Sequence, residues 1–275
     1  DLGNWARKVN TVDPEHFCYV NLFPNYATPA QLGAADYRDY VSRFAKEVPL
    51  HFLSFDSYPL TSAEGVYVKW HQNLEIFSDE AKKAGKPFWG FAQSILFDNL
   101  HEDPSLATMR VQMFTNLAYG AQGLQYFTYW QPVSPAEDFR GGPITLDGKR
   151  STVYDHIKTL NQEIKNLSGV FYGSKVRLLQ YTGKQIPLGT MRLTKLPEPL
   201  RLLETAGKSA LVSVLENGNQ RFIVIVNMDY KKKMSLTLLG NDSLKRVLKD
   251  GSIVPASVYA NTIEVEAGDM VVYTY

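Results

Sequence analysis

The side chain best placed to do chemistry is the carboxyl group of Asp56, which directly follows the short apolar run Leu50–Phe55 and precedes an aromatic residue, Tyr58. In parallel α/β folds, catalytic side chains gather where strands end, on the loops that lead to the next helix. A carboxylate there could act as an acid, a base or a nucleophile, or it could simply orient the loop by hydrogen bonding. Asp56 is therefore the candidate catalytic residue, with the second interpretation left open.

Amide and aromatic side chains occur at the ends of the neighbouring apolar runs. Asn21 lies in the first run, Gln93 ends the third, and Tyr129 and Trp130 end the fourth. Amides exchange hydrogen bonds with sugar hydroxyls, and aromatic rings stack on the apolar face of a pyranose. Together with Tyr58 they form the predicted substrate-binding set, and we expect an exposed Trp130. A packed strand-end amide is the alternative for Gln93.

Other chemistries lack their sequence signals. There is no Gly-rich phosphate loop, no Ser nucleophile elbow and no His-containing zinc motif, and His101-Glu102-Asp103 does not have metal-ligand spacing. We therefore predict no metal and no cofactor. The 29 Lys and Arg against 28 Asp and Glu leave a net charge of +1, without the basic surface that nucleic acid or an anionic membrane requires. No apolar stretch reaches the roughly 20 residues of a membrane helix.

Up to about residue 168, short apolar runs alternate with helical patterns, which is typical of strand–helix units around a parallel sheet. Thr28 to Gln31 has the pattern of a capping box, and Asp103 has that of an N-cap. An earlier helix is indicated by the apolar spacing of the first nine residues. The predicted strands span 17–23, 50–55, 87–93 and 123–130, and the later helices span about 28–48, 66–85, 103–120 and 152–169.

From residue 169 to the end, the apolar pattern has a period of two, which is typical of antiparallel strands. Asn217-Gly218 between two such runs is a strong hairpin signal. We predict an all-β antiparallel sandwich domain over 169–275, with Lys231-Lys232-Lys233 in a solvated loop. The single Cys18 excludes an internal disulfide, and its apolar neighbours predict a buried, inert thiol.

The first domain, residues 1–168, has only four strand–helix units, whereas a complete (β/α)₈ barrel takes about 250 residues. Four parallel strands curved for a barrel would leave an inner face and two edges uncovered. We therefore expect a complementary segment or subunit that completes the barrel. Residue 1 falls within a helical pattern, so the sequence is expected to be a fragment.

Several sequence segments resemble those of known proteins. The segments HFCYVNLFPNY, FLSFDSYPL, NLEIFSDEAKKAGKPFWGFA, NLAYGAQGLQYFTYWQP and VEAGDMVVYTY resemble glycoside hydrolases of gut Bacteroidetes that are described as similar to family-42 β-galactosidases. The resemblance implies that the four strands are barrel strands five to eight. It also implies an acid/base Glu on strand four, before residue 1, and a nucleophilic Glu near Gln93, where this sequence has no carboxylate.

Three functional hypotheses follow. The favoured one is a β-galactosidase-like glycoside hydrolase acting on a carbohydrate at the carboxyl-terminal face of the barrel, where Asp56, Tyr58, Gln93 and Trp130 should converge. The second is a catalytically silent carbohydrate-binding or scaffold protein on the same fold. The third is a non-carbohydrate structural protein whose sandwich mediates assembly. The resemblance further implies a secreted or periplasmic location.

Overall fold

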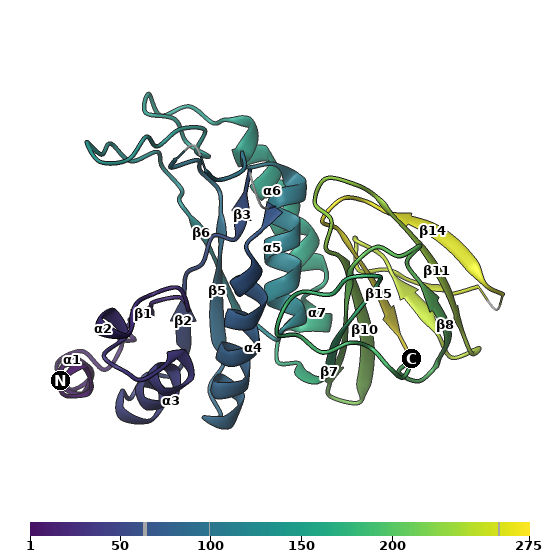
Figure 1. Cartoon of the computed structure of the whole chain (residues 1–275), viewed down its shortest axis with the longest axis horizontal. Coiled ribbons are helices and arrows are strands. Elements are labelled where there is room, and N and C mark those ends of the chain that lie inside the picture. Colours follow the sequence, from purple (N-terminus) through teal and green to yellow (C-terminus); the bar gives the residue numbers. More distant parts are fainter. Residues whose placement is uncertain (63–64, 99, 258) are drawn as a thin grey trace.

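A computed structural model describes residues 1–62, 65–98, 100–257 and 259–275. The first part of the chain forms a four-stranded parallel sheet in the order β1-β2-β5-β6 (Figure 1). Its strands are β1 (Asn21–Leu22), β2 (Leu53–Phe55), β5 (Phe88–Gln93) and β6 (Gly123–Phe127). Each observed strand lies within its predicted range and is shorter than that range. Among the described residues, no further strand pairs with β1 or β6, so both remain edges.

Helices cover one face of this sheet. These helices are α3 (Tyr37–Glu47), α4 (Val68–Lys83), α5 (Leu106–Ala118) and α6 (Thr152–Asn166). The other elements of this part are α1 (Leu2–Val12), the short helices α2 (Pro29–Leu32) and α7 (Ser168–Phe171), and the paired strands β3 (Leu60–Thr61) and β4 (Gly65–Val66). Strand side chains that point toward the helices are apolar: the ring of Phe55 lies 4.5 Å from that of Phe77 on α4. The predicted strand–helix alternation is thus present.

The two predicted helix caps have different outcomes. Thr28 accepts a hydrogen bond from the backbone of Gln31, and the Gln31 side chain accepts one from the backbone of Thr28, so the capping box is confirmed. The prediction that Asp103 is an N-cap was wrong, because Ser105 caps α5 in a reciprocal pair with Thr108. Asp103 lies two residues before that cap, where its carboxylate cannot replace the Ser105 hydroxyl at the free N–H groups of the first turn.

The second part of the chain is a β-sandwich of two antiparallel sheets. Asn217 pairs with Gln220, which confirms the predicted hairpin and places its two-residue turn at Gly218-Asn219; Gly218 has the positive φ of 59° that this turn position favours. The larger sheet has the order β13-β12-β15-β10-β9-β7 and the smaller has β14-β11-β8. The strands are β7 (Lys175–Thr182), β8 (Leu200–Glu204), β9 (Ala210–Asn217), β10 (Gln220–Asn227), β11 (Met234–Gly240), β12 (Lys245–Val247), β13 (Ile253–Pro255), β14 (Asn261–Val265) and β15 (Met270–Thr274).

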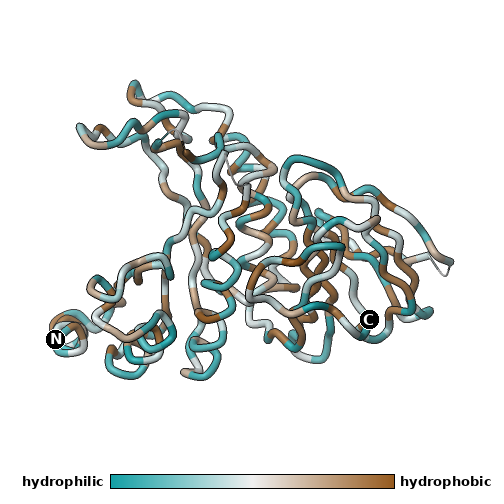
Figure 2. Tube along the Cα trace, viewed as in Figure 1, coloured by the Kyte–Doolittle hydropathy of each residue, from teal (hydrophilic) through white to brown (hydrophobic). Residues whose placement is uncertain are grey.

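The six-stranded sheet is apolar on both faces. On β10, Phe222 and Val224 belong to the hydrophobic cluster that includes the helices of the first part, whereas Ile223 and Ile225 belong to the cluster between the two sheets. The Ser213 hydroxyl on β9 also donates to the carbonyl of Ala118 at the end of α5, at 2.8 Å. Figure 2 shows apolar segments where α5 and these strands lie side by side. One core therefore continues from the parallel sheet's helices into the sandwich.

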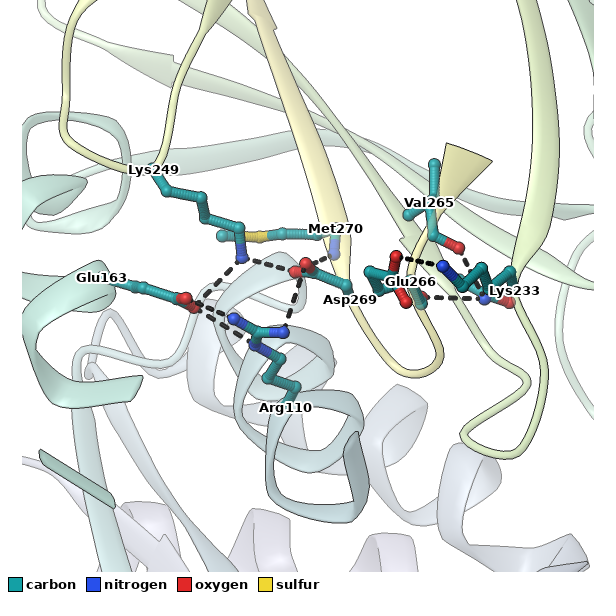
Figure 3. Close-up of polar contacts among 9 residues, drawn as sticks. Arg110, Glu163, Lys233, Lys249, Val265, Glu266, Asp269 and Met270 are labelled. Carbon is teal, nitrogen blue, oxygen red and sulfur yellow. Dashed lines mark hydrogen bonds and ion pairs between the residues drawn. The ribbon is translucent and has the colours of Figure 1, made fainter. Parts of the chain in front are cut away.

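A charged cluster joins the same two parts (Figure 3). Arg110 on α5 is paired with Glu163 on α6 and lies 3.5 Å from Asp269, which precedes β15. Lys249 contacts both carboxylates, with its ammonium 3.2 Å from Glu163. Arg110, Glu163 and Asp269 side chains are only 12–14% exposed, so this network is well shielded from water.

Candidate functional site

The face of the parallel sheet opposite the helices carries polar and aromatic side chains. Asn21 lies beside Ser54, and Ser54 lies beside Trp89, so these three residues share one face. Asp56, two residues beyond Ser54, continues the same face at the carboxyl end of β2 because side chains along a strand alternate. Gln125 on β6 joins them through its register with Phe91.

A hydrogen-bonded network connects this inner face. The Ser54 hydroxyl donates to the Asn21 amide oxygen at 3.0 Å and accepts from the Gln125 amide at 3.1 Å. The Tyr19 hydroxyl lies 3.0 Å from the Ser54 hydroxyl. The Asn21 amide nitrogen then donates to Asp56 at 2.7 Å. Side chains from β1, β2 and β6 thus form one polar layer that ends at the carboxylate.

Below this polar layer, the inner face is aromatic. The rings of Phe52 and Trp89 stack with centroids 4.1 Å apart, and Phe17 packs edge-on against both. Gly123 makes room for this stack, because a Cβ at that position would lie 2.4 Å from the Trp89 ring. The aromatic layer therefore forms the floor on which the polar layer rests. Trp89 thus has a structural role on the inner face, and Trp70 is buried on α4.

Asp56 and Tyr58 lie together at the open end of the face. Burial raises the pKa of the Asp56 carboxyl, while hydrogen bonds from Asn21 and Tyr58 oppose that rise. Burial, followed by the neighbouring Asp56 charge, raises the pKa of Tyr58. The Tyr58 ring is held by Phe97 and Phe127, each with its centroid 5.5 Å away. A partly desolvated carboxyl beside a fixed phenol can exchange hydrogen bonds or a proton with a bound hydroxyl.

Gln93 is not part of the accessible face. It is 2% exposed, and its amide nitrogen donates to the carbonyls of Ile95 at 3.0 Å and Glu102 at 3.2 Å. Its backbone N–H donates to Gln112. These contacts match the packed strand-end amide that the sequence left as the alternative.

Tyr129 and Trp130 are exposed, but neither joins the network around Asp56. Tyr129 lines a separate groove of about 540 Å³ with Tyr126 and Tyr154, along the outer edge formed by β6 and α6. Trp130 is 58% exposed, as expected, and its indole N–H donates to the Thr145 carbonyl at 3.0 Å, which fixes the ring's orientation. The structure therefore brings Asn21, Asp56 and Tyr58 together and leaves the two rings beyond β6 outside the hydrogen-bonded set.

Both edges of the sheet expose apolar side chains. On α1, Leu2, Trp5, Val9 and Val12 lie on one helical face and are 42–78% exposed. The groove at β6 and α6 provides apolar surface at the opposite edge. Exposed apolar surface of this extent is typical of an interface with further protein.

The described residues also bear on Cys18, on metal binding and on membrane spans. Cys18 is half-buried rather than buried, because β1 lies at an edge where no strand covers it. In the part of the chain that the structure describes, no group of three or more His, Cys, Asp or Glu side chains is arranged to hold a metal ion. Helices within the same ranges are too short or too polar to span a membrane.

Sequence reasoning missed Tyr19, Ser54 and Gln125 as members of the network. The signal for the first two was present, because Tyr19 and Ser54 each lie two residues before a selected residue and so share its face. Tyr26 was missed as well: it is 54% exposed after β1, and burial followed by the Asp56 charge raises its pKa.

Comparison with known proteins adds the following. The pattern of glycoside hydrolase family 42, described as beta-galactosidase, matches residues 9–167, which is more than half of the chain. A solved structure of a catalytic mutant of Gan42B, a family-42 beta-galactosidase from G. stearothermophilus, is similar with a TM-score of 0.57 and 9% identity, over 97% of this chain and 64% of that one. Beta-galactosidases from Halorubrum lacusprofundi (TM-score 0.45, 19% identity, 60% of this chain and 25% of that chain) and Marinomonas ef1 (0.40, 16%, 54% and 23%) are also similar. No curated protein sequence matches.

Proposed function

Because the chain belongs to glycoside hydrolase family 42, the family it was expected to resemble, we propose that it takes part in β-galactoside hydrolysis and binds the sugar on the inner face of its parallel sheet. The family's fold is a (β/α)₈ barrel with a β-rich domain, and this chain contains a parallel α/β part and a sandwich. The chain spans 64% of the length of the Gan42B structure. The activity of that whole protein is therefore a proposal for this chain.

The observation that carries the proposal is the Asn21–Asp56–Tyr58 set at the carboxyl ends of β1 and β2. A carboxylate, an amide and a phenol within one hydrogen-bonded group provide acceptors and donors for several sugar hydroxyls. The exposed rings of Tyr26 and Phe23, next to this set, supply apolar surface. In barrel enzymes this end of the strands is where substrates react.

We further propose that β1, β2, β5 and β6 are barrel strands five to eight and that another polypeptide segment or subunit supplies the first four. The exposed apolar side chains on α1 and the groove along β6 and α6 support this, because they lie at the two edges that such a segment would cover. The aromatic floor of Phe17, Phe52 and Trp89 would then become part of the packed barrel interior.

Hydrolysis requires two carboxyl groups, about 5 Å apart for retention and 6.5–9.5 Å apart for inversion. Asp56 is the candidate that this chain supplies. Near the end of β5, Asp98 is paired with His101 and Glu102 is paired with Lys231, so both carboxylates have other partners. We infer that the chain alone binds sugar with negligible turnover. A catalytically silent carbohydrate-binding protein is the second candidate, favoured by the burial of Gln93 at the expected nucleophile position.

Calorimetric titration of galactose and a 4-nitrophenyl β-galactoside tests the proposal. We expect the wild-type chain to bind, Asp56→Asn to weaken binding about tenfold through loss of a charged hydrogen bond, and Asp155→Asn, on the exposed side of α6, to leave affinity unchanged. Equal affinity of wild type and Asp56→Asn would reject the site. Robust release of nitrophenol by the chain alone would reject the inference of a missing second carboxyl. A secreted or periplasmic location stays a prediction.

A further inference from the structure

The Lys231-Lys232-Lys233 run in the sandwich loop is not simply solvated. The Lys231 ammonium lies 2.6 Å from the carboxylate of Glu102, on the loop that follows β5. The Tyr230 hydroxyl donates to the same carboxylate oxygen at 3.1 Å, and Tyr230 is only 8% exposed. A loop of the sandwich thus holds one carboxylate of the parallel-sheet part with two side chains.

Glu102 is in turn connected to both neighbouring strand ends. Its backbone N–H donates to the Leu60 carbonyl at 3.0 Å, two residues after Tyr58. Its backbone carbonyl accepts from the buried Gln93 amide at 3.2 Å. His101, the preceding residue, contacts the Tyr58 carbonyl at 3.2 Å through its Nε2. Whatever fixes Glu102 therefore also fixes the loop that carries Tyr58.

The sandwich loop has internal hydrogen bonds and an ion pair of its own. The Asp229 carboxylate accepts from the backbone N–H groups of Lys231 and Lys232, each at 3.0 Å, and pairs with Lys208 at 2.7 Å. The Asn227 amide donates to the Lys232 carbonyl at 2.9 Å. None of these bonds involves Glu102, so we expect them to support the loop when the Glu102 contact is removed.

We propose that Tyr230 and Lys231 are positioning residues, which act through Glu102 to hold the Tyr58 loop in its sugar-binding geometry. The sandwich would then have a functional role at the candidate site, in addition to its contribution to the core. The effect on sugar binding rests on the proposed function. The effect of Tyr230 and Lys231 on the loop that carries Tyr58 can be measured without any sugar.

The chain provides a matched control. Lys233 belongs to the same lysine run and is similarly exposed, but it pairs with Glu266 within the sandwich at 2.7 Å (Figure 3). Lys231→Met and Lys233→Met thus remove equal charge from one loop, and only the first breaks the contact with Glu102. Tyr230→Phe removes the second contact while keeping the ring.

Amide hydrogen exchange on the full chain gives the first readout. The N–H groups of Glu102 and Ser62, which donate to Leu60 and Leu100, should exchange about tenfold faster in the Tyr230→Phe/Lys231→Met variant, because both side-chain contacts to the Glu102 carboxylate are lost. Lys233→Met should not change them. In a Glu102→Gln background, Lys231→Met should add no further change. Unchanged exchange in the double variant would overturn the inference.

Galactoside titration gives the second readout, which a purely structural contact would not move. The double variant should bind about threefold or more weakly, whereas Lys233→Met should bind as wild type does. Faster exchange with unchanged sugar affinity would overturn the positioning role. If the wild-type chain binds no galactoside, the proposed function fails, and the exchange data alone decide whether the sandwich holds the loop.

Discussion

The four-stranded parallel sheet and the six-stranded antiparallel sheet differ in what lies against their faces. Both faces of the antiparallel sheet are covered, by helices on one side and by the smaller sheet on the other, and its central strands β9, β10 and β15 carry apolar residues at most positions. The parallel sheet is uniformly apolar only on the face toward its helices, and its other face carries the polar side chains of Asn21, Ser54, Asp56 and Gln125 above the aromatic floor.

Parallel sheets are usually buried on both faces, so polar side chains on one face carry a free-energy cost of desolvation. Packing alone does not explain why such side chains are present. Their hydrogen bonds to one another reduce this cost, and the raised pKa of Asp56, caused first by burial, shows that some of it remains. The difference indicates that the antiparallel sheet stabilises the fold, and it supports the proposal that the inner face of the parallel sheet binds sugar.

The largest expected effect tests the stabilising role. Phe222→Ala on β10 removes a ring that is 3% exposed in the shared core, and it should lower the free energy of unfolding by about 3–5 kcal/mol. Phe23→Ala, at the end of β1, removes a ring that is 48% exposed and should cost less than about 1 kcal/mol. Urea unfolding measures both. Similar losses for the two variants would contradict the comparison.

The charged cluster of Figure 3 should have the next largest effect. Arg110→Met leaves Glu163 and Asp269 with Lys249 as their one cationic partner among the described residues, and it should lower the free energy of unfolding by about 2 kcal/mol, less than for a completely buried pair. Lys149→Met, which breaks an exposed pair with Asp147, should leave the free energy of unfolding unchanged within error. A negligible effect of Arg110→Met would show that the other contacts between the two parts, the apolar core first among them, hold them together without the charged cluster.

The contact between α4 and the sandwich gives a pH-dependent prediction. Burial lowers the pKa of His71 to about 3, and its Nδ1 lies 2.9 Å from the Tyr181 hydroxyl. The unfolded chain takes up that proton near pH 6.5, so stability is complete above that pH and falls as pH decreases toward 3, by at most about 1.4 kcal/mol per pH unit.

Urea unfolding between pH 7 and 4 measures this slope. His71→Gln should flatten the curve, because it removes the group that titrates differently in the two states. His16→Gln, whose side chain is 82% exposed, should leave the slope as in wild type. An unchanged slope in His71→Gln would mean that other groups dominate the acid sensitivity.

The smallest expected change in stability concerns the inner face itself. The raised pKa of Asp56 means that its ionised form is less favourable in the folded chain, so Asp56 reduces stability above its unfolded pKa. Asp56→Asn should therefore leave the free energy of unfolding at pH 7 unchanged or raise it by less than about 1 kcal/mol, even though it weakens sugar binding. A loss above 2 kcal/mol would identify Asp56 as a structural residue.

Sequence patterns predicted the elements better than they predicted the site. Helix stripes and the Asn-Gly hairpin depend on local physics, so the alternation of the first part and the sandwich of the second were accessible. Asp56, Tyr58 and Asn21 were found because strand ends can be recognised. Trp130 and Tyr129 were placed with them only because they follow a strand, and the path of the loop beyond β6 is set by contacts such as Trp130 with Thr145.

The contacts that are distant in sequence could not be predicted. Lys231 and Glu102 are 129 residues apart, and nothing local in the lysine run distinguishes Lys231 from Lys233. Ser54 is a small polar residue inside an apolar strand. Its role in the network depends on Gln125, whose side chain reaches it across β5. Such pairs are fixed by tertiary packing rather than by propensity.

The central claim is that the inner face of the parallel sheet binds a galactoside and that the sandwich does not. NMR titration of the wild-type chain with galactose tests it most directly, because the side-chain amides of Asn21 and Gln125 report on the inner face and that of Asn227 reports on the sandwich. We predict saturable shifts for Asn21 and Gln125 that Asp56→Asn weakens, with Asn227 unmoved. Shifts confined to Asn227 and the sandwich backbone, with Asn21 and Gln125 unperturbed, would contradict the account.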